Sequence, residues 1–238
     1  MRKIILSLLL LVVSVSLQAQ TVPDNELIIR EINNASSPYY YPELFARYSL
    51  GDTTLTLTHY HYLYYGYAFH VDYRPLESNT AADNLLMAFE DRSLSEEDRN
   101  RSILKYAQQS FHYDPFSPTN INFLTYIYGS LGDSKNERIN SDRLEKIIAT
   151  ITSSGTGTEE KSPWHVLFFS HSNDIMIFMG KKTDKRMVIS RTIEFFPLQK
   201  KEGKIRGYYF DFSRAYMNKP ENPQRRKSPG FELNGTKL

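Results

Sequence analysis

The clearest pattern of hydrophobic and polar positions lies in residues 54–73, where aromatic and histidine side chains crowd together. Four large side chains recur there at positions i, i+3, i+4 and i+7, the spacing of one helix face: Tyr60, Leu63, Tyr64 and Tyr67. Thr56 or Thr58 is placed to cap the first turn. The pattern predicts a buried helix and then an extended segment that ends before Pro75. Alternation over residues 67–73 also fits a strand, but helix is the preferred interpretation.

Start signals and amphipathic periods predict further helices along the first two thirds of the chain. Ser95 precedes three acidic residues, and a hydroxyl cap with first-turn carboxylates suits the positive end of a helix. Pro42 and Pro118 suit first turns, where the missing N–H would have no helical partner. The predicted helices cover residues 26–32, a stretch from near 42, and residues 81–90, 95–111, 118–131 and 140–151.

The period changes near residue 153. Residues 153–161, SSGTGTEEK, have the composition of a linker. Residues 187–198 and 205–213 alternate like two antiparallel strands joined by the loop QKKEGK. Residues 174–179 fit a strand or a short helix. One face of the last strand is predicted to meet the helices: Arg206, Tyr208, Phe210 and Phe212.

These elements define the fold class. We expect an α+β protein in which a helical part, residues 20–152, packs against a small C-terminal antiparallel β-sheet in residues 162–217.

The two ends of the chain have other compositions. Residues 1–19 combine Arg2 and Lys3 with a short apolar run and small residues, which predicts a signal peptide. The apolar run is too short for a stable membrane span, so we expect an exported chain, periplasmic or secreted, with no transmembrane segment after cleavage. Residues 218–238 contain three prolines and a basic run, and predict a disordered tail. Attraction of that run to anionic surfaces is the alternative.

Composition narrows the function classes. The chain has no cysteine, which excludes disulfides, thiolate chemistry and a lipid-modified cysteine. Without Arg2 and Lys3, the 29 basic residues fall to the number of acidic residues, 27. A balanced chain gives no general electrostatic case for nucleic-acid binding, so no nucleic-acid partner is predicted.

The aromatic side chains supply the candidate binding residues. A buried tyrosine has a hydroxyl that needs a partner, so packed tyrosines imply an internal polar network or a half-wet groove. An aromatic core is the preferred interpretation. If a groove exists, five rings are candidates to stack on a sugar or hold a peptide: Tyr60, Tyr64, Tyr65, Tyr67 and Trp164.

Candidate general acids and bases are His165, His171 and Asp174, and Ser170 adjoins His171. No GxSxG or HExxH frame organises them, so no catalytic residue is assigned. Histidines at 59 and 61 lie two apart, which on a helix points them to different sides. No metal ligand and no cofactor is therefore predicted.

Two resemblances add to this interpretation. Residues 104–133 resemble one tetratricopeptide-type helical hairpin, with the Asp114 and Pro115 turn between its helices; one such unit cannot build a stacked groove. The segments RYSLGDTTLT, HYLYYGYAF, DYRPL and GYYFDFS resemble a domain-of-unknown-function family of exported proteins from Gram-negative gut-type bacteria. That resemblance implies one exported unit of helices and a small sheet, and it implies no activity.

The function predicted from sequence is a non-catalytic exported binding or assembly module in the periplasm or at the cell surface. Its expected partner is an envelope protein or a glycan. The alternative is a hydrolase acting on envelope or dietary glycan or peptide.

Overall fold

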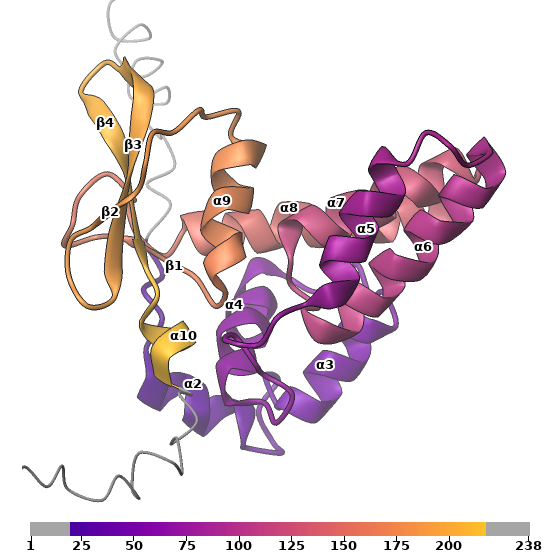
Figure 1. The fold of residues 1–238 in the computed structure, drawn as a ribbon. Helices are drawn as coiled ribbons and strands as arrows, with labels where there is room; N and C mark the ends of the chain where they lie inside the picture. Colours follow the sequence, from indigo (N-terminus) through magenta and orange to yellow (C-terminus); the bar gives the residue numbers. More distant parts are fainter. Residues whose placement is uncertain (1–19, 218–238) are drawn as a thin grey trace, which may run out of the picture.

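The computed structural model describes residues 20–217. The predicted signal peptide and the predicted tail lie outside the described residues. Helices make up most of the described chain, and a small four-stranded sheet forms late in it (Figure 1), which confirms the α+β class. In chain order the elements are α2 (Asn25–Ile32), α3 (Tyr41–Ser49), α4 (Leu57–Gly66), the 3₁₀ helix η1 (Tyr67–Phe69), α5 (Thr80–Glu90), α6 (Glu96–Tyr113), α7 (Pro118–Ser130), α8 (Ser134–Thr152), β1 (Trp164–His165), α9 (Phe169–Phe178), β2 (Met187–Val188), β3 (Ile193–Glu202), β4 (Ile205–Asp211) and α10 (Ser213–Met217).

Helix α4 is the predicted tyrosine-rich helix, and it contacts α2, α3 and α8. Thr56 caps it, because its hydroxyl accepts from the His59 N–H. The extended segment predicted after it is wrong, since residues 67–69 form η1 and residues 71–72 form a turn. Gly66 keeps helical torsions, with φ of −66°, so it does not stop the chain from coiling onward.

Helices α5 to α8 form the arm on the right of Figure 1, where α6 and α7 are joined by a four-residue turn. Ser95 caps α6 as predicted, and Pro118 lies in the first turn of α7. Helix α8 begins at residue 134, six residues before the predicted start. Asp133 caps α8 there, because its side chain accepts from the Asn136 N–H.

The sheet has the strand order β1-β4-β3-β2. Strand β3 pairs antiparallel with β4 and β2, but β1 pairs parallel with β4, so the sheet is mixed and the fully antiparallel prediction is wrong. Parallel pairing requires a crossover, which α9 and the β2–β3 hairpin supply. The segment 187–198, predicted as one strand, forms the two strands β2 and β3. A turn separates them, in which the Ile193 N–H donates to the Ser190 hydroxyl.

Side-chain burial and backbone conformation test two predictions for the C-terminal part. Tyr208, Phe210 and Phe212 are buried, as expected. Arg206 was predicted on the same face but is exposed, because it lies next to the β3–β4 turn at the end of the hairpin. Residues 174–179, left open between strand and helix, belong to α9 apart from the final residue, which caps it. Helix α9 lies between the sheet and the helical arm (Figure 1), so it joins the two parts.

The segment predicted as a linker, residues 153–161, packs against the sheet. The Trp164 indole N–H donates to the Gly155 carbonyl at 3.1 Å, and the Tyr209 N–H donates to the Gly157 carbonyl at 2.7 Å. Gly157 has φ of +68° and lies against the Trp164 ring. Backbone and ring approach this closely only because Gly157 has no side chain.

Replacing Gly157 with alanine is therefore expected to destabilise the protein by about 3 kcal/mol, the sum of left-handed backbone strain and a forced repacking of the core. The added carbon would lie 2.5 Å from the Trp164 ring. Gly180→Ala is the matched control, since its φ is +66° and no heavy atom lies within 4 Å of the new carbon. Urea unfolding of both variants measures the difference. Equal losses would show that the Trp164 contact is unimportant.

Candidate functional site

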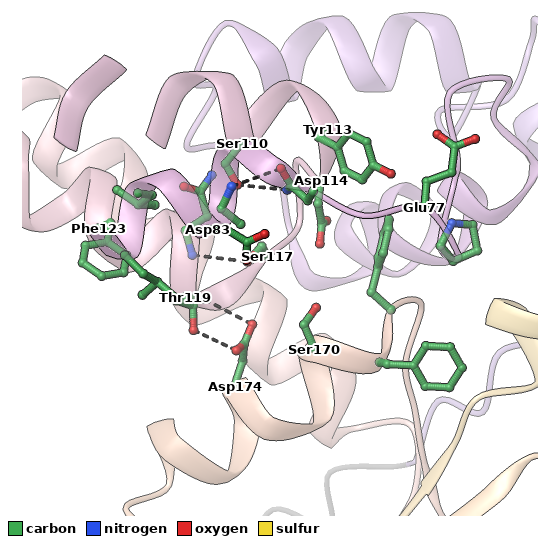
Figure 2. Close-up of a pocket in the computed structure, with 18 residues that line it drawn as sticks. Glu77, Asp83, Ser110, Tyr113, Asp114, Ser117, Thr119, Phe123, Ser170 and Asp174 are labelled. Carbon is green, nitrogen blue, oxygen red and sulfur yellow. Dashed lines mark hydrogen bonds between the residues drawn. The ribbon is translucent and has the colours of Figure 1, made fainter. Parts of the chain in front are cut away.

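A cavity of about 380 Å³ opens where four helices meet. Its walls come from α5, the end of α6, the first turns of α7, and α9, with residues 75–77 at one side (Figure 2). These segments are far apart in sequence, so only the folded chain assembles the cavity. It is large enough for a small ligand or for one side chain of a larger one.

Carboxylates and apolar side chains share the lining of the cavity. Its charged lining residues are all carboxylates: Glu77, Asp83, Asp114 and Asp174. Within the described residues, 20–217, no lysine, arginine or histidine lines it. The apolar wall consists of Leu85, Leu86, Phe123, Phe168 and Phe169. An acidic and aromatic lining of this kind suits a cation with an apolar stem.

Asp174 is the most informative of the four carboxylates. Its side chain lies on α9 and accepts from the Thr119 hydroxyl at 2.7 Å and from the Thr119 N–H at 3.4 Å (Figure 2). Burial, which leaves Asp174 only 9% exposed, raises its pKa. Within residues 20–217 no cationic side chain forms an ion pair with it.

The α7 N-terminus compensates Asp174 only in part. A helix terminus is equivalent to roughly half a positive charge, which is less than the full charge of a carboxylate. An ionised Asp174 therefore leaves net negative charge at the cavity wall.

Asp114 lines the cavity and begins a buried hydrogen-bonded chain. Its carboxylate accepts from the Phe116 N–H at 3.1 Å and lies 2.9 Å from His171 Nε2. His171 Nδ1 lies 2.8 Å from the Tyr64 hydroxyl, which also accepts from the Leu167 N–H at 3.2 Å. Every group has a partner if His171 carries its proton on Nε2 and the Tyr64 hydroxyl donates to Nδ1.

This chain explains where His171 lies. The side chain is fully buried, and both ring nitrogens are occupied by Asp114 and Tyr64. His171 and Asp174 lie three residues apart on α9, yet only Asp174 lines the cavity, together with Ser170. His165 lies elsewhere, with Nδ1 3.3 Å from Asp211 Oδ2. The predicted acids and bases are therefore not gathered into one constellation.

The five candidate ring residues lie in the core and are between 0% and 5% exposed: Tyr60, Tyr64, Tyr65, Tyr67 and Trp164. None lines the acidic cavity. The Tyr65 hydroxyl donates to the His165 carbonyl at 3.2 Å, and the Tyr73 hydroxyl to the Leu167 carbonyl at 2.6 Å. These bonds form an internal polar network between α4 and the chain before α9. Ligand stacking on the rings stays a prediction, and a ligand would have to open the core to reach them.

Sequence reasoning missed three of the four cavity carboxylates: Glu77, Asp83 and Asp114. Asp114 was interpreted as a turn residue, and the other two had no pattern around them. The signal available was local, since Asp114 follows α6 and precedes a proline, where an aspartate accepts backbone N–H groups.

The cavity carboxylates do not form a metal site by position. No group of three or more His, Cys, Asp or Glu side chains in residues 20–217 is placed to hold a metal ion. In the same residues, no helix is both long enough and apolar enough to cross a membrane.

Comparison with known proteins places the chain in a family. Residues 26–221 match the model of a domain of unknown function, DUF4919, so the chain belongs to that family. The match begins inside α2 and extends past α10, the last helix of the described residues, and it includes every described residue that lines the acidic cavity. No curated protein and no solved structure matches the chain.

Proposed function

We propose that the protein is an exported, non-catalytic binding module whose acidic cavity takes a cationic group on an apolar stem. The observation that supports this most is the charge of the lining, whose charged residues are four carboxylates. Glu77 pairs with Arg74 and Asp114 with His171, whereas Asp83 and Asp174 form no ion pair within residues 20–217. An ammonium or guanidinium group would pair with Asp174 while its stem packs against Phe123 and Phe169.

A peptide or envelope protein that presents a lysine or arginine is the partner we propose. The pair α6 and α7, whose sequence resembles one tetratricopeptide hairpin, supplies two of the cavity walls. The cavity suits one long basic side chain rather than a flat sugar ring, because its charged groups are carboxylates and apolar side chains line the same cavity.

A matched pair of probes tests the proposal. N-acetyl-lysine amide should bind in calorimetry, and N-acetyl-norleucine amide, which lacks the ammonium group, should not. Asp174→Asn keeps an acceptor oxygen for one of the two Thr119 hydrogen bonds but removes the charge, so we expect roughly tenfold to hundredfold weaker binding, the worth of a charged hydrogen bond. Affinity should also fall as the pH drops through the raised pKa of Asp174, because protonation removes the charge.

The control is Glu145→Gln, a change of the same charge at an exposed position on α8 outside the cavity. It should leave the affinity unchanged. Equal binding of the lysine and norleucine probes, or equal weakening by both substitutions, would overturn the proposal.

Export is part of this proposal and rests on the sequence of residues 1–19 and on the resemblance to exported proteins. N-terminal sequencing of the chain secreted by a Gram-negative host should find a start near Gln20. A chain retained with Met1 intact would contradict export.

Hydrolysis of a glycan or peptide is the second candidate, and one observation favours it. Asp114 and Asp174 line the same cavity, and burial raises the pKa of Asp174, as acid and base pairs require. Envelope glycan and peptide incubated with the protein should then release products that Asp174→Asn does not release. Binding of the lysine probe without turnover of either material would reject it.

A further inference from the structure

A second cavity, of about 440 Å³, lies against the other face of the last turns of α6. It is bounded by α6, α7, α8 and the end of α3. Among residues 20–217 no aspartate or glutamate lines it, and its polar lining residues all carry at least one hydrogen-bond donor: Ser49, Gln108, His112, Tyr128, Asn136, Asn140 and Arg143. Its chemistry is the opposite of that of the acidic cavity.

Arg143 is the only permanently charged residue of this lining, and it is 8% exposed. Its guanidinium donates to the Tyr48 carbonyl at 2.5 Å, to the Ser49 carbonyl at 3.3 Å and to Asn140 Oδ1 at 3.1 Å. The Tyr48 and Phe111 rings lie beside it, 4.7 and 5.1 Å from the guanidinium carbon to the ring centres. All of these partners are uncharged.

No carboxylate in residues 20–217 forms an ion pair with Arg143, and its Nε has no hydrogen-bond partner there. The neighbouring Asp142 pairs with Lys146 instead. The carbonyls of Tyr48 and Ser49 belong to the end of α3, and a helix C-terminus offers roughly half a negative charge. The buried guanidinium is therefore only partly neutralised, which is costly unless a counter-ion arrives.

The helical period of α6 keeps the two cavities apart. On one face of its last turns, Gln108, Phe111 and His112 line the cavity that contains Arg143. On another face, Ser110 and Tyr113 line the acidic cavity, as does Asp114 just after the helix. The body of α6 would therefore separate an anion in the second cavity from the carboxylates of the first.

We infer that the Arg143 cavity binds a small oxyanion, a phosphate or sulfate group. The positive charge of the guanidinium and its unpartnered Nε–H suit such a group, and the amide and imidazole side chains of the lining carry further N–H groups. The inference is independent of the proposed function, since it involves other residues and the opposite charge.

Calorimetry tests the inference. Inorganic phosphate and inorganic sulfate are each titrated into the protein at constant ionic strength, and chloride is titrated as the comparison anion. Either oxyanion should bind in the millimolar range or more tightly and raise the melting temperature, whereas chloride should not. Gln108→Glu places a carboxylate at the cavity wall from an exposed position, so it should weaken binding by about tenfold, the effect of roughly 1.4 kcal/mol.

The matched control is Gln109→Glu, the same change on the neighbouring exposed residue, which lines neither cavity. It should bind as the unchanged protein does. Arg143→Gln should abolish binding, and its circular dichroism spectrum shows whether the variant keeps its overall helical content. Failure of the unchanged protein to bind either oxyanion, or equal effects of the two glutamine substitutions, would overturn the inference.

Discussion

Raising the pH above about 10 should unfold the protein in one cooperative step. Burial raises the pKa of seven core tyrosines above the ordinary value of 10.0, that of Tyr65 to about 12: Tyr41, Tyr48, Tyr60, Tyr64, Tyr65, Tyr67 and Tyr73. The native state holds these protons while the unfolded state releases them near the ordinary value. Stability is therefore complete below that pH and falls as the pH rises.

The expected size of this effect is large. Each tyrosine contributes up to about 1.4 kcal/mol per pH unit, so seven together remove on the order of 10 kcal/mol within one unit. That is comparable with the whole stability of a typical domain, about 5 to 15 kcal/mol. Phenolate absorbance and circular dichroism should therefore change together. Ionisation of all 17 tyrosines at ordinary pH with the helical signal intact would show that the rings are open to water.

Replacing His171 with alanine should lower the free energy of unfolding by about 4 kcal/mol, the usual cost of breaking a buried pair by removing one member. The substitution leaves the Asp114 carboxylate with the Phe116 N–H and the Tyr64 hydroxyl with the Leu167 N–H as their remaining partners. It also empties a fully buried volume. Chemical denaturation of the purified variant measures the loss.

Two tyrosine variants on α4 separate the polar chain from simple packing. Tyr64→Phe removes the hydroxyl that joins His171 to the Leu167 N–H, so it should cost about 1 to 3 kcal/mol. Tyr60→Phe is the control, because in the described part of the chain no hydrogen bond is recorded for its hydroxyl. Near-equal losses in the two variants would contradict a structural role for the chain from Asp114 to Tyr64.

Most of the helical framework follows from local signals in the sequence. The i, i+3, i+4 and i+7 spacing marked α4, and the acidic residues after Ser95 marked α6, because each of these features is complete within one turn or two. The sheet was harder. Residues 164–169 are apolar except for His165 and show no period, and they hold a two-residue strand and the start of α9. The partner of β1 lies 46 residues further on, where local patterning gives no information on direction.

The candidate site was less predictable than the fold. Asp174 was named from sequence as an acid or base, but its neighbour in the cavity, Thr119, lies 55 residues away. Asp114 and His171 are 57 residues apart and meet only because α9 folds back onto the α6–α7 turn. The tyrosines are numerous in the sequence, but they are buried, and the hydroxyls of Tyr64, Tyr65 and Tyr73 bind backbone and imidazole groups inside the core. The number of tyrosines in the sequence indicated the core, whereas the acidic cavity forms only when helices far apart in the sequence pack together.

The central claim is that a ligand cation meets the Asp174 carboxylate inside the acidic cavity. The most direct test is an NMR titration of the Asp174 side-chain carboxyl carbon, with and without saturating N-acetyl-lysine amide. In the free protein the pKa should lie above its ordinary value of 3.8, and the bound cation should lower it by favouring the charged form. A pKa that does not change when the probe binds would contradict the claim.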